Sequence, residues 1–233
     1  MALVVFVAPL ASALPNLRIM PLGDSITRGN GARDQMGYRS RLRQRLTNLG
    51  TSVDLVGSLK YPPNRADNDH EGHSGTVLAQ INTYWQLSIA AQPNVVLIHA
   101  GTNNMDLEID LEGSPGVLAE IIDGIFEEAP ETTVLVAPVI WANDTRMQQN
   151  TDRFNPHVTA IVEERQEDGK HILEVPINIT VADLWDTKHP NDRGYDKMAS
   201  GWLHAILEAD ERGWLEEPIP RDPASFPGVG LGT

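Results

Sequence analysis

The chain carries the three residue types that nucleophilic acyl transfer requires, and two of them stand three positions apart. Ser25 follows an apolar segment ending in Gly23, a residue that permits a tight bend. A serine hydroxyl attacks a carbonyl carbon only when an oriented base removes its proton. His189 can act as that base, and Asp186 can turn back within one loop to hold the other imidazole nitrogen. Taken singly, Ser25 could cap a helix and His189 could be a surface residue, so only the combination points to catalysis.

Acyl transfer also needs hydrogen-bond donors for the negative charge that develops on the carbonyl oxygen. Asn103, within the segment Gly101–Asn104, follows an apolar run and carries a side-chain amide. Gly75 closes the segment His70–Gly75, where a backbone N–H can approach a substrate because no side chain intervenes. The backbone N–H of Ser25 would be a third donor. Asparagine after a strand is often only a turn former, so the evidence for an oxyanion site is the occurrence of all three donors together with the serine and its base.

Five short segments rich in Val, Ile and Leu are predicted to be strands that position these residues. Continuous apolar runs such as Val95–Ile98 are typical of strands buried on both faces of a parallel sheet. Helical patterns lie between them, which predicts a three-layer α/β domain with its active site outside the carboxyl ends of the strands. The predicted strands are Leu17–Leu22, Val53–Gly57, Asn94–Ala100, Thr132–Val139 and His171–Val175.

Apolar residues spaced three and four apart predict helices with one face in the core. The first helix begins at Tyr38, places apolar residues up to Leu49 on one face, and ends at Gly50. Its arginines, at alternate positions from Arg39 to Arg45, are expected to form a solvated face rather than a nucleic-acid patch. Further helices are predicted around Val117–Phe126, Val158–Val162 and Tyr195–Ile206.

Four short blocks, spread over most of the chain from Leu17 to Ile206, resemble those of the SGNH, or GDSL-type, hydrolases. The resemblance implies that Ser25 is the nucleophile, that His189 is the base and that Asp186 orients it. It also implies that the three donors form an oxyanion hole, and that the fold is a flavodoxin-like α/β/α sandwich with a five-stranded parallel sheet. Such chemistry requires no cofactor. The four blocks are Gly23–Ser25, Gly75, Gly101–Asn103 and Asp186–His189.

Two longer stretches, His70–Gly75 and His189–Ala199, are similar to family-three carbohydrate esterases. This similarity implies the removal of acetyl groups from xylan and related acetylated sugars. Asp24, His73 and Trp141 are candidate substrate contacts, although Trp141 could equally be a packing residue.

Two features qualify this interpretation. Asn104 stands where the third block commonly ends in Asp, which bears on fine geometry because no catalytic role is assigned there. A cluster of carboxylates and imidazoles could bind zinc, but it lacks the helical His-Glu-x-x-His pattern. We therefore expect no metal, and interpret the cluster as part of a loop lining the active edge. The cluster comprises Asp67, Asp69, His70, Glu71 and His73.

The composition limits the partners of the chain. With 32 acidic against 18 basic residues the formal charge is −14, which disfavours nucleic acid because phosphate neutralisation needs a concentrated basic face. The absence of cysteine excludes disulfides, thiolate metal sites and cysteine nucleophiles. No apolar stretch approaches the roughly 20 residues of a membrane-spanning helix. We expect a monomer whose substrate is an acetylated carbohydrate or another small ester.

The chain is expected to have three parts. Residues 1–13 predict a secretory leader, because an uncharged, mostly apolar run ends in a small-x-small cleavage site, although no Lys or Arg precedes the run. Residues 14–215 would form the hydrolase domain, and the proline- and glycine-rich residues 216–233 an irregular tail. In a secreted chain Asn143 and Asn178 would be glycosylation sites.

Two rival functions are compatible with the same sequence. A non-catalytic carbohydrate-binding module could use this scaffold, because a fold alone does not confer activity. A lipase, thioesterase or broad carboxylesterase would use the same residues but accept longer acyl chains, which a pocket built for acetate excludes. Hydrolysis of a chromogenic acetyl ester would distinguish an esterase from the binding module. A profile of rate against acyl length would distinguish an acetyl esterase from a lipase, thioesterase or broad carboxylesterase.

Overall fold

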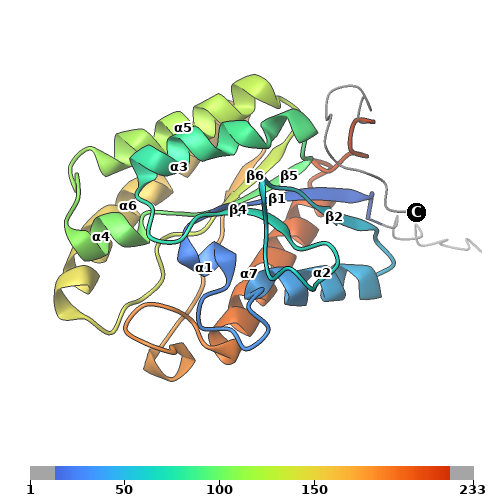
Figure 1. Cartoon of the computed structure of the whole chain (residues 1–233). Helices are drawn as coiled ribbons and strands as arrows, with labels where there is room; N and C mark the ends of the chain where they lie inside the picture. The colour runs from blue at the N-terminus through green and yellow to red at the C-terminus, as the bar shows by residue number, and fades with distance from the viewer. Residues whose placement is uncertain (1–13, 221–233) are drawn as a thin grey trace, which may run out of the picture.

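The computed structural model describes residues 14–220, and a seven-stranded sheet forms its middle layer (Figure 1). Four strands pair in parallel in the order β1-β5-β6-β7, and β2 and β4 both pair in parallel with the other edge of β1. A short antiparallel strand, β3, extends the sheet beyond β4. The strands are β1 (Leu17–Gly23), β2 (Val53–Leu55), β3 (Leu59–Lys60), β4 (Asp69–Gly72), β5 (Val95–His99), β6 (Thr133–Val136) and β7 (Ile172–Glu174).

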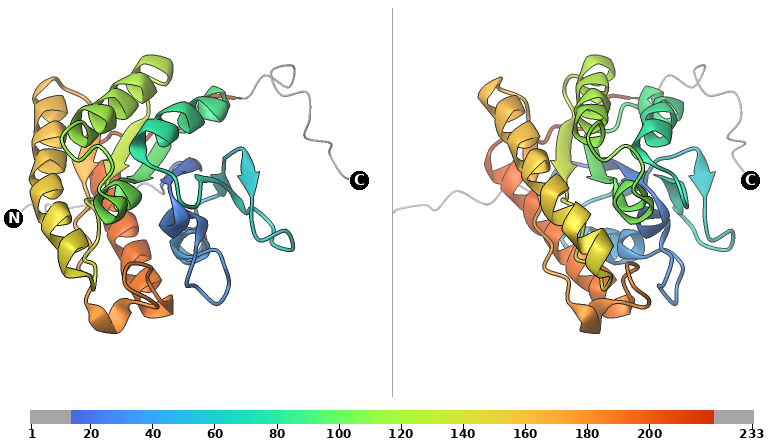
Figure 2. Two further views of the ribbon diagram at one scale, coloured as in Figure 1. Left: turned by 60° about the vertical axis from the view of Figure 1, so that its left-hand side comes forward. Right: turned by 90° about the vertical axis from the view of Figure 1, so that its left-hand side faces the viewer.

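Helices pack against both faces of the sheet, which confirms the predicted three-layer architecture (Figure 2). Val95 and Leu97 of β5 face the layer of α2 and α7, whereas Val96 and Ile98 face the layer that contains α3, α5 and α6. Because both faces of this strand are covered, its apolar run is continuous. The helices are α1 (Ser25–Arg28), α2 (Tyr38–Asn48), α3 (Leu78–Tyr84), α4 (Thr102–Leu107), α5 (Ser114–Glu128), α6 (Thr145–Glu167) and α7 (Asp192–Glu211), with 3-10 turns η1 (Trp85–Leu87), η2 (Ile89–Ala91) and η3 (Val181–Asp183).

The segment before Gly75 contains a strand where the sequence predicted a loop. β2 pairs with only the first three residues of β1 and leaves the rest of that edge open. β4 pairs with the last two residues of that edge, with Glu71 opposite Leu22 and Gly72 opposite Gly23. Charged residues are depleted in strands, so the residue pattern carried no strand signal here. As a result, Gly75 follows a strand end directly beside the end of β1.

The arginines of α2 do not form the predicted solvated face. Arg39 is completely buried, and its guanidinium donates hydrogen bonds to the backbone carbonyls of Thr27, Arg28, Tyr61 and Asn68. The other three arginines form ion pairs with carboxylates from neighbouring segments. The prediction was wrong because spacing along one helix does not show which acceptors other segments bring to it.

The helix boundaries otherwise follow the sequence signals. α2 begins at Tyr38, and Gly50, just beyond its end, has a φ of +90°. Leu49, predicted to lie on the buried face, is exposed because the helix has already ended. Pro130 lies just beyond the end of α5, as predicted.

The predicted leader and most of the predicted tail lie outside the described residues. The beginning of the tail packs on the sheet, because the side-chain amide of Asn94 donates to the carbonyl of Glu216 over 2.7 Å. In addition, Nη1 of Arg18 donates to the carbonyl of Ile219 over 2.9 Å.

The exterior bears on two further expectations. Asn143 and Asn178 are both exposed, as an acceptor for a glycan must be, and their glycosylation stays a prediction. Between residues 14 and 220, no helix combines the length and the apolar character that crossing a membrane would need.

Candidate active site

Ser25 lies where β1 ends and the short helix α1 begins. The Oδ1 atom of Asp24 accepts a hydrogen bond from the N–H of Ile26 over 3.0 Å and so caps α1. The N–H of Ser25 belongs to the first turn of α1, where backbone N–H groups have no acceptor within the helix. The turn therefore presents the hydroxyl and the N–H of Ser25 at the carboxyl edge of the sheet.

A chain of hydrogen bonds joins Ser25 to His189 and Asp186, which lie before α7. The Oγ atom of Ser25 lies 2.8 Å from Nε2 of His189. The Nδ1 atom of His189 lies 2.7 Å from Oδ2 of Asp186. The backbone N–H groups of Lys188 and His189 donate to Oδ1 of Asp186 over 2.9 and 2.7 Å. Asp186 thus holds the histidine through both its backbone and its ring.

The contacts of Asp186 keep its side chain ionised. Burial alone would raise the pKa of Asp186, but the hydrogen bonds from His189 and Lys188 outweigh burial and lower the pKa below its ordinary value. A carboxylate at this place accepts a proton-bearing Nδ1 and leaves Nε2 of His189 to accept the proton of Ser25. The ion pair of Lys188 with Asp106 of α4 further anchors the loop.

Gly75 and Asn103 lie at strand ends on either side of β1 and are connected through Thr76. Nδ2 of Asn103 donates to the carbonyl oxygen of Thr76 over 2.8 Å, which uses one amide hydrogen and leaves the other for a ligand. Gly75 has a φ of +80°, and a Cβ placed on it would meet no atom within 4 Å. Within residues 14–220 no backbone or side-chain acceptor pairs with its N–H. These groups could hold a negatively charged oxygen beside Ser25.

Asn104 connects the helices that flank this pair of donors. Its Oδ1 atom accepts a hydrogen bond from the N–H of Leu78, and its Nδ2 atom donates to the carbonyl of Ile109, each over 2.9 Å. An aspartate could accept the first bond but could not donate the second. Asn104 therefore makes one hydrogen bond that the aspartate common in the family could not make, and the neighbouring donor Asn103 stays in place.

His73, a predicted substrate contact, also supports the segment that carries the glycine donor. Its Nε2 atom lies 2.7 Å from Oε2 of Glu71, and its ring stacks on Tyr84 with the centroids 3.8 Å apart. Glu71 is completely buried and also accepts hydrogen bonds from Ser58 and Ser88. The strand before the donor is therefore fixed by a fully bonded carboxylate.

The structure bears differently on Asp24 and Trp141, the other two predicted substrate contacts, and the role of Trp141 stays a prediction. Asp24 is completely buried because its carboxylate caps α1, so the expectation that it touches substrate is wrong for this structure. Trp141 packs against the core layer of α2 and α7 and lines a separate hollow near the start of α6. The lining of that hollow includes none of Ser25, His189 and Asp186.

The residues considered for zinc binding have other partners. Across residues 14–220, no three His, Asp or Glu side chains are grouped so that they could hold a metal ion. Asp67 pairs with Arg43. Nδ1 of His70 accepts a hydrogen bond from the N–H of Gly72 over 2.9 Å, and burial, assisted by nearby positive charge, lowers the pKa of His70 to about 2. His70 is therefore neutral at physiological pH.

Trp185 is a further candidate for the site that the sequence reasoning did not single out. It directly precedes Asp186, and its side chain is 67% exposed. It lines a groove of about 490 Å³ together with Arg28 and Tyr61. The available signal was its position, since an aromatic residue next to a candidate catalytic residue lies on the same loop.

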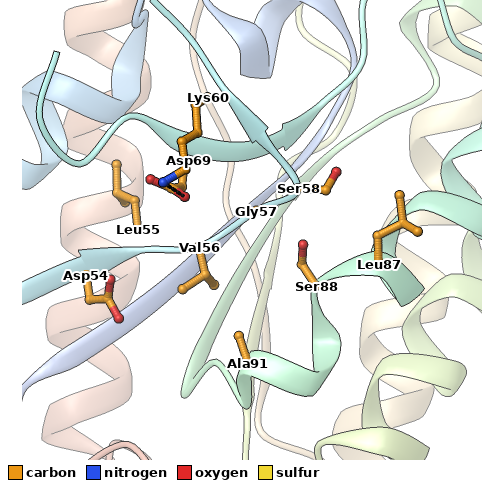
Figure 3. Close-up of a pocket in the computed structure, with 10 residues that line it drawn as sticks. All are labelled: Asp54, Leu55, Val56, Gly57, Ser58, Lys60, Asp69, Leu87, Ser88 and Ala91. Atoms are coloured by element: carbon orange, nitrogen blue, oxygen red, sulfur yellow. Dashed lines mark ion pairs between the residues drawn. The ribbon is translucent and has the colours of Figure 1, made fainter. Parts of the chain in front are cut away.

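A second hollow lies at the edge of the sheet, away from these residues (Figure 3). It has a volume of about 340 Å³ and is bounded by the β2–β4 region and by η1 and η2. Lys60 and Asp69 form an ion pair on its wall, and the hydroxyl of Ser88 is bonded to Glu71. The lining contains none of the candidate catalytic residues.

Comparisons with known proteins place the chain in a family. The sequence profile of the GDSL-like Lipase/Acylhydrolase family matches residues 22–197. A family 3 carbohydrate esterase from Clostridium thermocellum is 30% identical, with a TM-score of 0.72 over 86% of this chain and 100% of that one. A family 3 carbohydrate esterase from Talaromyces cellulolyticus shares the fold at 22% identity, with a TM-score of 0.73 over 84% of this chain and 99% of that one.

A longer relative also matches. The alignment with a multidomain esterase from Ruminococcus flavefaciens shows 29% identity over 234 residues. It covers 84% of this chain and 29% of that protein. The chain thus spans less than a third of the length of this relative. Because the family profile matches most of the chain, and the same fold recurs in the solved carbohydrate esterases, the chain belongs to the GDSL-like lipase/acylhydrolase family of ester hydrolases.

Proposed function

We propose that this chain is a serine esterase that removes acetyl groups from carbohydrates, namely xylan or related acetylated sugars. The observation that carries the proposal is the hydrogen-bond chain from Ser25 through His189 to Asp186, with links of 2.8 and 2.7 Å. Membership of the family supports ester hydrolysis. The similarity to the carbohydrate esterase of Clostridium thermocellum supports a sugar substrate.

The proposed mechanism proceeds through an acyl-enzyme. Oγ of Ser25 attacks the carbonyl carbon of the acetyl ester while Nε2 of His189 accepts the hydroxyl proton. The N–H groups of Ser25 and Gly75 and the amide of Asn103 donate to the oxyanion of the tetrahedral intermediate. His189 then protonates the departing sugar oxygen as its bond to the acetyl carbon breaks, which releases the sugar as an alcohol and leaves the acetyl group on Ser25. Water that gives its proton to His189 attacks this ester. His189 then returns that proton to Oγ of Ser25 as the bond between Oγ and the acetyl carbon breaks, and the acetyl group leaves as acetic acid, which ionises to acetate.

Acetate release from acetylated xylan and from a chromogenic acetyl ester tests the proposal. The wild-type chain should hydrolyse both substrates, and Ser25→Ala should lose turnover on both while its melting temperature stays close to that of the wild type. Ser52→Ala, which alters an exposed serine, is the matched control and should change neither rate. Wild-type turnover in Ser25→Ala would show that the nucleophile is a different residue.

The length of the acyl group tests the substrate class. With esters of one alcohol, the rate should be highest for acetyl and should fall as the chain lengthens, because a site shaped for acetate excludes longer chains by contact. A rate that is highest for longer acyl chains would contradict the proposed substrate and would indicate a broad carboxylesterase or lipase. Absence of hydrolysis on every ester would favour a carbohydrate-binding module on this scaffold.

A further inference from the structure

A groove next to the candidate base has no part in the mechanism above. Its volume of about 490 Å³ lies within the range of roughly 300–1,000 Å³ typical of small-molecule sites. The segment after α1 and the segment before α7, which lie at the same end of the molecule, both contribute to it (Figure 1). The N–H of Trp185 donates to the carbonyl of His189 over 2.8 Å. A Cβ placed on Gly31 would lie 3.2 Å from Cβ of Trp185 and 3.5 Å from Cβ of His189. The groove therefore starts at the loop that carries the base.

The walls of the groove combine an exposed aromatic ring with planar hydrogen-bonding groups. The guanidinium of Arg28 lies over the ring of Tyr61, 3.6 Å from its centroid, and Nη1 of Arg28 donates to Oδ1 of Asn30 over 2.9 Å. Nε and Nη2 of Arg28 donate to no acceptor within residues 14–220, so these N–H groups are available to a ligand. The hydroxyl of Tyr61 donates to Oε1 of Gln35 over 2.7 Å, which leaves the amide hydrogens of Gln35 free to donate.

This combination matches the two kinds of surface on a sugar. The C–H face of a pyranose ring packs on an aromatic side chain, and its hydroxyl and ring oxygens accept hydrogen bonds from guanidinium and amide groups. The lining includes no Asp or Glu, although the chain as a whole carries a formal charge of −14. The groove is therefore rich in donors, as a ligand with many oxygen acceptors requires.

We propose that this groove is a subsite for one sugar unit of an acetylated oligosaccharide, with Trp185 as the surface on which the ring stacks. The inference rests on the proposed function. Neither Ser25 nor His189 lines the groove, so the unit that it holds is a neighbour of the unit that carries the cleaved acetyl group. A single acetylated sugar would leave the groove empty, and a longer chain would fill it.

Hydrolysis of acetylated xylose and acetylated xylotetraose by the same variants tests the subsite. The wild type should show a kcat/KM about tenfold higher or more for the tetrasaccharide, because one stacked ring contributes binding on the order of one factor of ten. Trp185→Ala should lose most of this difference, chiefly through KM, and Trp185→Phe should keep most of it. Leu87→Ala, at a residue 57% exposed on the hollow of Figure 3, is the control and should change neither value.

Three outcomes would overturn the subsite while deacetylation still stands. One is an unchanged dependence on chain length in Trp185→Ala. Another is an equal fall in kcat for both substrates, which would mean that Trp185 only supports the neighbouring Asp186. The third is a wild-type dimer that dissociates in Trp185→Ala during sedimentation, which would assign the exposed ring to a second copy of the chain.

A binding measurement separates failure of the subsite from failure of the proposed function. If the wild type releases no acetate from any carbohydrate, the proposed function is wrong. The subsite is then tested separately: Ser25→Ala is titrated with unacetylated xylotetraose while tryptophan fluorescence is recorded. A saturable change in fluorescence that disappears in Trp185→Phe, which lacks the indole of residue 185, would support the subsite. No change at millimolar sugar would overturn it.

Discussion

The side-chain amide of Asn103 lies 2.8 Å from the carbonyl oxygen of Thr76, and this hydrogen bond spans the end of the central strand β1. Thr76 follows β4 and Asn103 follows β5, and these two strands flank β1 on opposite sides. The bond therefore sets the spacing of two candidate oxyanion donors, the N–H of Gly75 and the amide of Asn103, around Ser25.

Asn103→Ala should reduce kcat roughly 100- to 1,000-fold with little change in KM, because the lost donor acts on charge that develops only in the transition state. Steady-state kinetics on a chromogenic acetyl ester measure the split. Asn104→Asp, which keeps the acceptor for the N–H of Leu78, should remain within a few-fold of the wild type. An effect of Asn103→Ala confined to KM would contradict the role of this amide.

Asp186→Asn should lower kcat by about 1,000- to 10,000-fold while the chain stays folded. The asparagine amide can donate to Nδ1 of His189, which places the ring proton on Nε2 and removes the acceptor for the hydroxyl of Ser25. Kinetics on the acetyl ester, with circular dichroism as the check on folding, provide the measurement. A fall of less than about tenfold in a folded variant would show that the carboxylate does not orient the base.

His70 should make the fold sensitive to acid. Its pKa is lowered from 6.5 to about 2 by burial, so the unfolded chain binds a proton that the folded chain rejects. The stabilising contribution is complete above pH 6.5 and is lost progressively as the pH falls toward 2, by at most about 1.4 kcal/mol for each pH unit.

Chemical denaturation of His70→Gln between pH 7 and pH 4 tests this dependence. Glutamine can still accept the hydrogen bond from the N–H of Gly72 but does not titrate, so the free energy of unfolding should fall less steeply than in the wild type. The exposed His204 offers the control His204→Gln, whose slope should equal that of the wild type. Equal slopes of unfolding free energy against pH for all three proteins would contradict the proposed role of His70 in acid sensitivity.

Arg39→Met should destabilise the fold by about 3 kcal/mol or more, because four carbonyl oxygens, two of them in buried and two in part-buried hydrogen bonds, lose their donor. Arg45→Met on the same helix removes a partly exposed ion pair with Asp196 and should cost about 1 kcal/mol or less. Urea denaturation of both variants measures the difference. Similar losses in the two would mean that the carbonyl contacts of Arg39 contribute little.

The sequence predicts this fold well where strands are apolar on both faces. The run Val95–Ile98 indicates a buried parallel strand from its residue types alone, and the apolar segments of the sequence likewise locate β1, β2, β6 and β7. Because active sites of such folds lie beyond the carboxyl ends of strands, Ser25, Asn103 and His189 could be grouped before any coordinates were known.

Features that depend on several distant segments could not be predicted in this way. β4 is a strand because β2 leaves part of the edge of β1 open, which no property of Glu71 reveals. Arg39 is buried because three other segments bring carbonyls to it. Trp185 lines a groove because the loop containing Gly31 packs beneath it. In each case the deciding contact joins residues far apart in the chain.

Trapping of the acyl-enzyme tests the central claim most directly. The chain is mixed with a chromogenic acetyl ester, quenched in acid within the first turnover, digested, and mapped by mass spectrometry. The hydroxyl of Ser25, 2.8 Å from Nε2 of His189, should be the site of acetylation, and Ser25→Ala should give neither the modified peptide nor a burst of chromophore. An acetyl group on another residue, or a full burst from Ser25→Ala, would contradict the account.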